Sequence, residues 1–495
     1  MADPFPEYEQ FDATGLAALV ADGEVTAVEL MAAAVTRIEA SEINAVVSTR
    51  FESAAAEIDA GLASGPFSGV PFLIKDLASQ EGEPVTFGSV LFRDYVGEVT
   101  PTAIGRMLGT GLVSLGRTNT PEFGLLPTTE PVLHGPTRNP WDRSRSPGGS
   151  SGGAAAAVAA GIVPMAQASD GGGSIRIPAS ACGLFGMKPT RGRVPLHPPS
   201  IADYVSTSLC VSRSVRDTAG LLDAIAGSIA GAQYRPPRPG EPYVVSSATD
   251  PGRLRIALAT ESFDGRRLHP SCVAAVEATG RLLEDLGHHV EVASPEISGE
   301  AISEAFLAVW MSMAETAALL VLDEVESRRG GRQMRRVLGD VRAIRLVSRL
   351  TARRAGSPGF EPFTLGLIEH SAHLTPGRLL MAMTALQEAS YALGSFLEGY
   401  DLFVTPTLGE PPLPLGAIDQ TRPFVDVAAQ LVDYVPFTPI GNFSGFPAMS
   451  MPLHWDGDGL PIGVHFMGRQ NGEADLFGIA GQVERAQPWF AHRPA

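Results

Sequence analysis

The sequence has few of the residues that hold metal ions or form disulfide frameworks. It contains 3 cysteines in 495 residues, and they are too scattered for a disulfide scaffold or a cysteine-based zinc site. Its 10 histidines show neither HExxH nor a similar metal-binding spacing. A metal centre is therefore not expected.

Positive charge and long apolar runs are also scarce. Lys and Arg total 37 against 54 Asp and Glu, a formal net charge of -17. Surfaces that bind nucleic acid or anionic membranes need clustered Lys and Arg, so we expect neither partner. The most apolar stretch, residues 154–168, is mostly alanine and too weak for a membrane span. The acidic, proline-broken start "MADPFPEYEQFD" is no signal peptide, and we expect a cytoplasmic protein.

Short apolar runs alternate with helical patterns along the chain. Residues 26–40 have helical periodicity with a capping box at Thr26 and Glu29, and residues 69–77 and 112–115 read as strands. Residues 301–400 are mostly helical in pattern, and strand-like runs return in "DLFVTPT", "AMSMPLHW" and "GLPIGVHFMG". The stretch 234–252 is a linker or a long surface connection. This alternation predicts one α/β domain over residues 1–495.

Two glycine-rich loops carry serines, "PGGSSGG" from Pro147 and "SDGGGS" from Ser169. A phosphate loop needs GxxxxGK, but Ala154 stands where the lysine belongs. The GxSxG elbow of α/β-hydrolases needs a preceding buried strand, whereas "TRNPWDRSRSP" is polar and proline-broken. In a third interpretation, a helix at 151–160 and a strand at 162–168 bring Ser174 back towards Ser150. The glycines before Ser174 then present bare N–H groups to an oxyanion.

The two loops, together with "GVPFLIKD", "GRTNTPEFG", "GPTRNPW", "GGSIRIPASACGLFGMKPTRGRVP" and "NFSGFPAMSMP", resemble the amidase signature family. The strongest block runs from about residue 69 to 194. The resemblance implies an α/β amidase signature fold with one large mixed β-sheet flanked by helices on both faces. Residues 301–400 would then form a helical insertion on the substrate side.

The resemblance also implies a catalytic site without metal or cofactor. Lysine acts as a base only when it is neutral, so its pKa must be lowered. This chain departs from the family at Gly171, where Ile, Thr or Ala is more usual. The residues implied are the nucleophile Ser174, the cis-serine Ser150 and the base Lys75, with backbone amides of Gly171, Gly172, Gly173 and Ser174 as oxyanion hole and Asp170 and Arg176 as supports of the loop.

Within the family, "TTEP" and "GPTRNPW" look similar to hydrolases of aminohexanoate oligomers and to bacterial urethanases. The resemblance implies a neutral, partly apolar small-molecule amide, anilide, carbamate or ester as substrate, and it is compatible with a homodimer. An alternative is the glutaminase-type amidase subunit of a tRNA-dependent amidotransferase, although Ile177 stands where such members often have glutamine. A catalytically idle binding module is the non-enzymatic alternative. Candidate pocket residues are Leu125, Leu126, Thr129, Trp310, Met311 and Met313.

Overall fold

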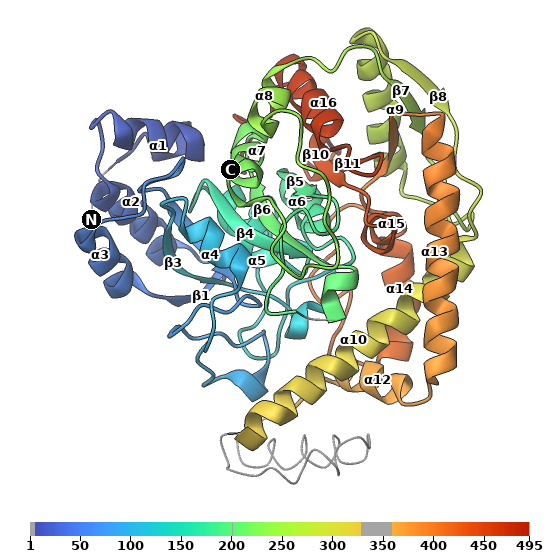
Figure 1. The fold of residues 1–495 in the computed structure, drawn as a ribbon, viewed down its shortest axis with the longest axis horizontal. Coiled ribbons are helices and arrows are strands. Elements are labelled where there is room, and N and C mark those ends of the chain that lie inside the picture. The colour runs from blue at the N-terminus through green and yellow to red at the C-terminus, as the bar shows by residue number, and fades with distance from the viewer. Residues whose placement is uncertain (1–4, 200, 328–358, 495) are drawn as a thin grey trace.

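The computed structural model describes residues 5–199, 201–327 and 359–494, and its main feature is a mixed sheet of eight strands (Figure 1). In sheet order, neighbouring strands from β4 across to β9 pair antiparallel. β7 then pairs parallel with both β9 and β8. The large mixed sheet expected from the sequence is confirmed. In sheet order the strands are β4 (Met165–Asp170), β6 (Thr207–Ser212), β5 (Phe185–Lys188), β10 (Ala448–Trp455), β11 (Pro461–Gly468), β9 (Leu402–Pro406), β7 (Arg255–Leu258) and β8 (His289–Val292).

A second, smaller sheet was not anticipated from the sequence. Its strands are β1 (Val46–Thr49), β3 (Val113–Thr118) and β2 (Pro71–Lys75), in that order. β1 runs antiparallel to β3, and β2 runs parallel to it. All five residues of β2 are buried, which explains why this run is continuously apolar up to its last residue, Lys75.

Helices cover both faces of the large sheet. Successive side chains of each strand point to opposite faces, so both faces carry side chains that the helices bury. In β9, Leu402 and Val404 join the core beneath α9 and α16, whereas Phe403 joins a separate cluster beneath α13 and α15. The helices are α1 (Ala13–Ala21), α2 (Ala27–Ala40), α3 (Phe51–Ala60), α4 (Thr102–Leu108), α5 (Gly152–Ala159), α6 (Arg176–Cys182), α7 (Val215–Ile225), α8 (Tyr243–Ala248), α9 (Pro270–Asp285), α10 (Gly299–Ser327), α12 (Pro362–Ser371), α13 (Pro376–Glu398), α14 (Phe424–Tyr434), α15 (Thr438–Ser444) and α16 (Glu473–Ala486).

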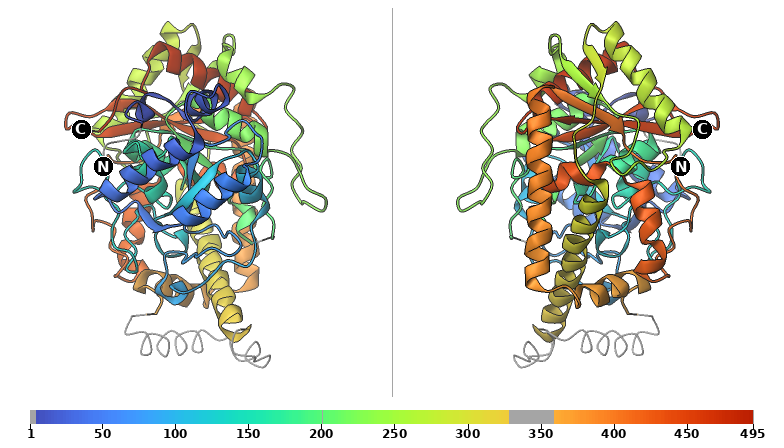
Figure 2. Two further views of the ribbon diagram at one scale, coloured as in Figure 1. Left: turned by 90° about the vertical axis from the view of Figure 1, so that its left-hand side faces the viewer. Right: turned by 90° about the vertical axis from the view of Figure 1, so that its right-hand side faces the viewer.

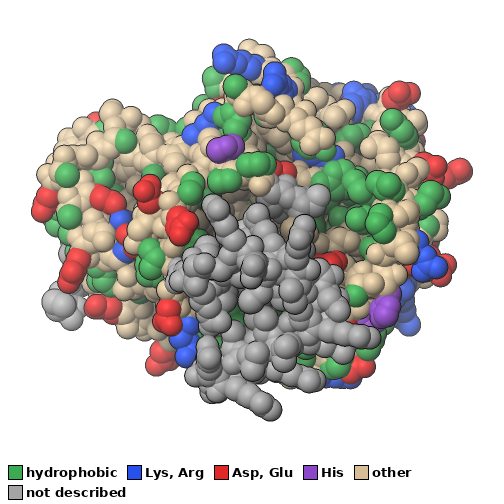
Figure 3. All heavy atoms as spheres, turned by 60° about the horizontal axis from the view of Figure 1, so that its bottom comes forward, with side chains coloured by type: hydrophobic (Ala, Val, Ile, Leu, Met, Phe, Trp, Pro, Cys, Tyr) green, Lys and Arg blue, Asp and Glu red, His purple; other side chains and the backbone are tan. Residues whose placement is uncertain are grey.

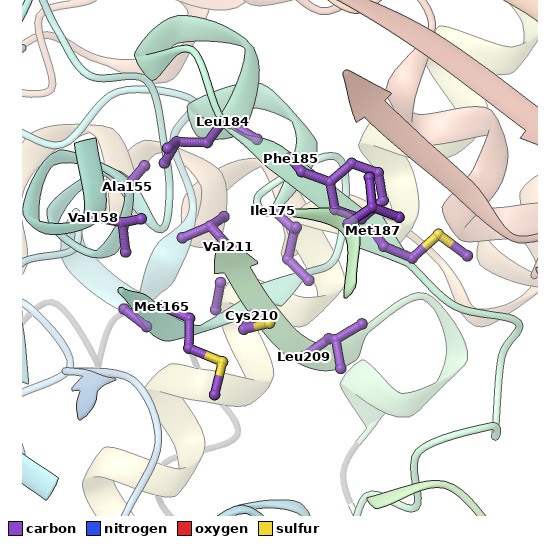
Figure 4. Close-up of a cluster of buried hydrophobic side chains, with 14 of the residues drawn as sticks. Ala155, Val158, Met165, Ile175, Leu184, Phe185, Met187, Leu209, Cys210 and Val211 are labelled. Atoms are coloured by element: carbon purple, nitrogen blue, oxygen red, sulfur yellow. The ribbon is translucent and has the colours of Figure 1, made fainter. Parts of the chain in front are cut away.

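The centre of the core lies between α5 and the β4–β6 edge of the large sheet. Ala155 and Val158 of α5 face Met165 of β4 and Val211 of β6 in the close-up of Figure 4. α5 consists of glycines, alanines and one valine, and these small side chains allow the helix to be buried along its whole length. This packing fixes the segments before and after α5, which carry the serines of both glycine loops.

Several local expectations can be checked directly. The capping box at the start of α2 is confirmed, with Thr26 and Glu29 each bonding the other's backbone. The stretch 234–252 is not a plain linker, because it contains α8, whose Tyr243 and Val244 amides donate to Asp223. Within the described residues, no helix combines the length and apolarity that crossing a membrane requires.

Helices α10, α12 and α13 extend from one side of the large sheet. α10 packs along α13, and Figures 1 and 2 show the two helices beside each other at one edge of the molecule. Figure 3 looks at the end where α10 and α12 reach the surface. On the part of this face that is not drawn in grey, acidic and basic side chains are interspersed.

Candidate active site

The two glycine loops meet at the end of β4. α5 begins after Ser151, β4 returns to Asp170, and the Ser151 amide donates to the carbonyl oxygen of Ser174 at 3.3 Å. The Ser151 hydroxyl donates to the Ser169 carbonyl oxygen at 3.2 Å. The peptide bond between Gly149 and Ser150 is cis. The helix and returning strand that were predicted to bring the two loops together are therefore present.

Lys75 enters this site from the small sheet, at the last position of β2. Its side chain is fully buried, and its Nζ donates to Ser150 Oγ at 2.7 Å and to Ser169 Oγ at 3.1 Å. Burial lowers the pKa of Lys75 from 10.5 to about 7, against an opposing attraction from Asp170. A substantial share of Lys75 is therefore neutral near pH 7 and able to accept a proton.

Ser174 completes the group of three predicted catalytic side chains. Its exposed fraction is 7%, compared with 2% for Ser150 and 0% for Lys75, and it lines a cavity that neither of the other two lines. Among the described residues, the structure contains the lysine-to-Ser150 hydrogen bond and none between the hydroxyls of Ser150 and Ser174. The arrangement can relay a proton once those two hydroxyls are brought together, because catalytic hydrogen bonds often tighten only around substrate.

The Asp170 carboxylate accepts hydrogen bonds from the backbone of the glycine loop. Its Oδ1 accepts the Gly173 amide at 2.8 Å, and its Oδ2 accepts the Ile175 amide at 3.2 Å. Burial alone would raise the pKa of Asp170, but Arg176, whose Nη2 lies 2.9 Å from its carboxylate, holds that pKa well below its usual value. The Gly173 amide is therefore already engaged, whereas Gly171, Gly172 and Ser174 are the other three residues whose amides were expected to form an oxyanion hole.

The C-terminal elements complete this support. Asn442 of α15 accepts from Arg176 Nη2 at 2.7 Å, and His465 of β11 lies 2.9 Å from Arg176 Nη1. The Thr438 hydroxyl donates to the Gly172 carbonyl oxygen at 2.7 Å. Thr438, Asn442 and His465 were not predicted from the sequence. Asn442 lies in the "NFSGFP" segment, so the family resemblance contained a signal for it.

An aromatic pair from α10 covers the glycine loop. The rings of Phe306 and Trp310 stack with centroids 5.5 Å apart, and the Trp310 indole donates to the Leu125 carbonyl oxygen at 3.2 Å. A Cβ added at Gly171 would lie 3.5 Å from the Trp310 ring, in ordinary contact. Glycine at position 171, where the family more often has a larger residue, therefore leaves a small space between the loop and the Trp310 ring.

Ser174 lines a cavity of about 120 Å³, here called the Ser174 cavity. None of the described residues that line it is charged. Leu125, Leu126 and Trp310 line it as predicted, together with Phe306 and Ile440 among others.

Three of the candidate pocket residues lie elsewhere. Thr129 is fully buried behind the loop and donates its hydroxyl to the Gly148 carbonyl oxygen at 2.9 Å. Met311 packs against the cluster that contains Phe360 and Phe363. Met313 lines a second space, on the Lys75 side. A helix turns by about 100° per residue, and Met311 lies on the side of α10 that packs against that cluster and not on the side that lines the cavity.

Comparisons with known proteins place this arrangement in context. The family model described as Amidase matches residues 29–477. The 6-aminohexanoate-cyclic-dimer hydrolase of Paenarthrobacter ureafaciens is 36% identical over 508 residues, covering 98% of this chain and 96% of that protein. A solved 6-aminohexanoate cyclic dimer hydrolase structure superposes with a TM-score of 0.84 at 32% identity, covering 98% and 99% of the two chains. A bacterial aryl acylamidase gives 0.82 at 26% identity, with the same coverage.

Proposed function

Since the chain belongs to the amidase signature family and is a hydrolase of C–N bonds, we propose that it cleaves neutral, partly apolar amides, anilides or carbamates through an acyl-enzyme on Ser174. The observation that carries the proposal is the 2.7 Å hydrogen bond between Ser150 Oγ and the fully buried, readily deprotonated Lys75, close to Ser174, which lines the cavity.

The proposed mechanism uses only the chain's own groups. Ser174 Oγ attacks the carbonyl carbon while its proton passes to Ser150, which gives its own proton to Lys75. The amides of Gly171, Gly172 and Ser174 donate to the oxyanion that forms. The proton then returns through Ser150 to the departing nitrogen, and the C–N bond breaks. Water clears the acyl group by the same relay in reverse.

The lining of the Ser174 cavity supports an uncharged acyl group. Burying an unpaired charge among apolar and aromatic side chains such as Phe306 and Leu126 would be costly. The same argument disfavours the glutaminase alternative, since glutamine carries an ammonium and a carboxylate that need partners. Two of the solved relatives bear the names 6-aminohexanoate cyclic dimer hydrolase and aryl acylamidase, which agree with an amide or anilide as substrate.

The test compares acyl p-nitroanilide, p-nitrophenyl ester and aryl carbamate substrates of matched acyl group. We expect hydrolysis of at least the anilide by wild type, its loss in Ser174→Ala, and an acyl adduct on Ser174 detected by mass spectrometry. The ranking of the three rates separates an amidase from a urethanase. Retained activity in Ser174→Ala would show that another nucleophile acts, and activity that requires an added partner protein would favour the amidotransferase subunit.

A further inference from the structure

Arg213 is an almost fully buried arginine that lies directly after β6, with an exposed fraction of 5%. Its Nη2 donates to the Phe11 carbonyl oxygen at 2.9 Å. Its Nε and Nη1 are buried, and neither has a hydrogen-bond partner in the part of the chain that the structure describes. Burying a charge is costly unless the charge is paired, and a buried N–H without an acceptor adds to that cost. The surroundings of Arg213 therefore favour an added acceptor of negative charge.

Positive charge gathers around Arg213, although the chain as a whole carries a net charge of -17. Burial and, after it, the nearby charge of Arg493 lower the pKa of Arg213 to about 10. Arg493 forms an ion pair with Glu9 at 2.8 Å, and Arg37 pairs with the same carboxylate at 3.3 Å. Two other guanidinium groups therefore already share the charge of Glu9, which acts on Arg213 only from a distance.

Asp217 is a second acidic residue that acts on the charge of Arg213. Its carboxylate accepts the amides of Ala13 and Thr14 at 2.8 Å each, and burial raises its pKa to about 7. Near neutral pH this carboxyl is therefore protonated in a substantial share of molecules and carries less than a full negative charge. Among the described residues, Arg213 forms no ion pair with Asp217 or with Glu9.

A small cavity lies where the C-terminal tail, residues 487–494, meets Arg213. Its volume is about 10 Å³, and its described lining includes Arg213 and Arg493 but no acidic side chain. A space of this size holds one water-sized particle, so a monatomic ion fits and a carboxylate or phosphate group does not. The centroid of the Phe490 ring lies 4.5 Å from the Arg213 guanidinium carbon and 5.4 Å from that of Arg493, so the ring attracts both cations without neutralising either.

We propose that this cavity binds a single monatomic halide ion, chloride in physiological solution, which accepts hydrogen bonds from Nε and Nη1 of Arg213 and lies beside Arg493. The cavity is also lined by Ala159 and Cys182, the last residues of α5 and α6. Because α5 and α6 start from the two glycine loops, the ion ties the tail to the ends of these helices that are farthest from the proposed catalytic serines. Its binding therefore raises the stability of the protein and leaves the acyl preference unchanged.

The test follows thermal unfolding in sodium chloride, with sodium gluconate replacing chloride at constant ionic strength. Gluconate is too large for the cavity, so it controls for general effects of salt. In wild type, Tm should rise with chloride and then saturate, by about 2 °C at one hundred times the dissociation constant. Bromide should replace chloride, and in crystals soaked in bromide its anomalous signal should lie at hydrogen-bond distance from Nε and Nη1 of Arg213.

Arg213→Met removes the charge and the N–H donors, and it should abolish the dependence of Tm on chloride. Arg216→Met is the matched control and should keep that dependence, because Arg216 pairs with Asp12 and does not line the cavity. Arg493→Gln is a second variant, used so that misfolding of Arg213→Met does not decide the result, and it should raise the chloride concentration at half effect by about tenfold. The proposal is overturned if Tm of wild type does not saturate with chloride, if the Arg213 variant keeps the dependence, or if the soaked crystals show no bromide in the cavity. These measurements use no substrate, so their outcome is independent of the proposed function.

Discussion

Replacing Lys75 by methionine should abolish hydrolysis and stabilise the fold at neutral pH. Lys75 is fully buried, and burial lowers its pKa from 10.5 to about 7. A lowered lysine pKa means that the unfolded chain binds the proton more tightly than the folded chain does. The wild-type protein therefore loses stability at and below pH 7 and regains it as the pH rises towards 10.5.

The size of the effect follows from the two pKa values. At about 1.36 kcal/mol per pH unit, the interval from 10.5 to about 7 corresponds to roughly 5 kcal/mol at low pH, about 4 at pH 7 and about 2 at pH 9. Methionine also loses the hydrogen bonds to Ser150 and Ser169, at about 1 kcal/mol each. That loss does not depend on pH, so the change of about 2 kcal/mol between pH 7 and pH 9 isolates the contribution of the buried amine.

The assay is guanidinium unfolding of wild type and Lys75→Met at pH 7 and pH 9. The stability advantage of the variant should shrink between these pH values. Ser174→Ala is the control, because it alters the same site without removing a titrating group and should give a difference that is constant with pH. A pH-independent difference for Lys75→Met would refute the account of Lys75 as a buried amine whose pKa is lowered. In wild type, kcat/KM should rise with pH around 7 as Lys75 loses its proton.

The remaining predictions concern the glycine loop and the cavity beside it. Gly171→Ala should keep most activity, since its Cβ would lie 3.5 Å from the Trp310 ring, which is an ordinary contact. Gly173→Ala should lose about a hundredfold or more in kcat, because Gly173 has a φ of +132° and the added Cβ would overlap the Thr438 side chain. Asp170→Asn should lower the free energy of unfolding by about 3 kcal/mol and reduce kcat far more than it alters KM, as shown by denaturation and steady-state kinetics, since it leaves Arg176 without its charge partner. Trp310→Ala should shift acyl preference towards bulkier groups in a panel of anilides, with no shift if the indole does not bound the acyl group.

The residues of the proposed relay were expected from short motifs that resemble the amidase signature family, and the structure places Lys75 Nζ within hydrogen-bond distance of Ser150 Oγ. Helix α5 and strand β4 followed from local patterns, and their lengths permitted Ser174 to return towards Ser150. The buried, apolar character of β2 could likewise be read from the sequence. It gave no indication that β2 pairs with β1 and β3 in a sheet of its own, since pairing partners are set by contacts distant in the chain.

The pocket was harder to predict than the relay because its lining depends on helical phase and on loop paths. Met311 was grouped with Trp310 by proximity in sequence, although one residue along a helix changes the direction of the side chain by about 100°. Thr129 was grouped with Leu125 and Leu126, but the chain turns behind the glycine loop, where its hydroxyl bonds the Gly148 carbonyl oxygen. The use of the Gly173 amide by Asp170 depends on the folded conformation of the loop and has no signature in composition or spacing.

The order of strands in the large sheet has a consequence for how the protein is made. β10 and β11 come last in the sequence yet pair in the middle of the sheet, between β5 and β9, and His465 on β11 contacts the arginine that steadies the nucleophile loop. A ribosome must therefore release almost the entire chain before the middle of the sheet can close. A chain truncated before β11 would keep Lys75, Ser150 and Ser174 but would lack the His465 contact with Arg176 and a central strand of the large sheet.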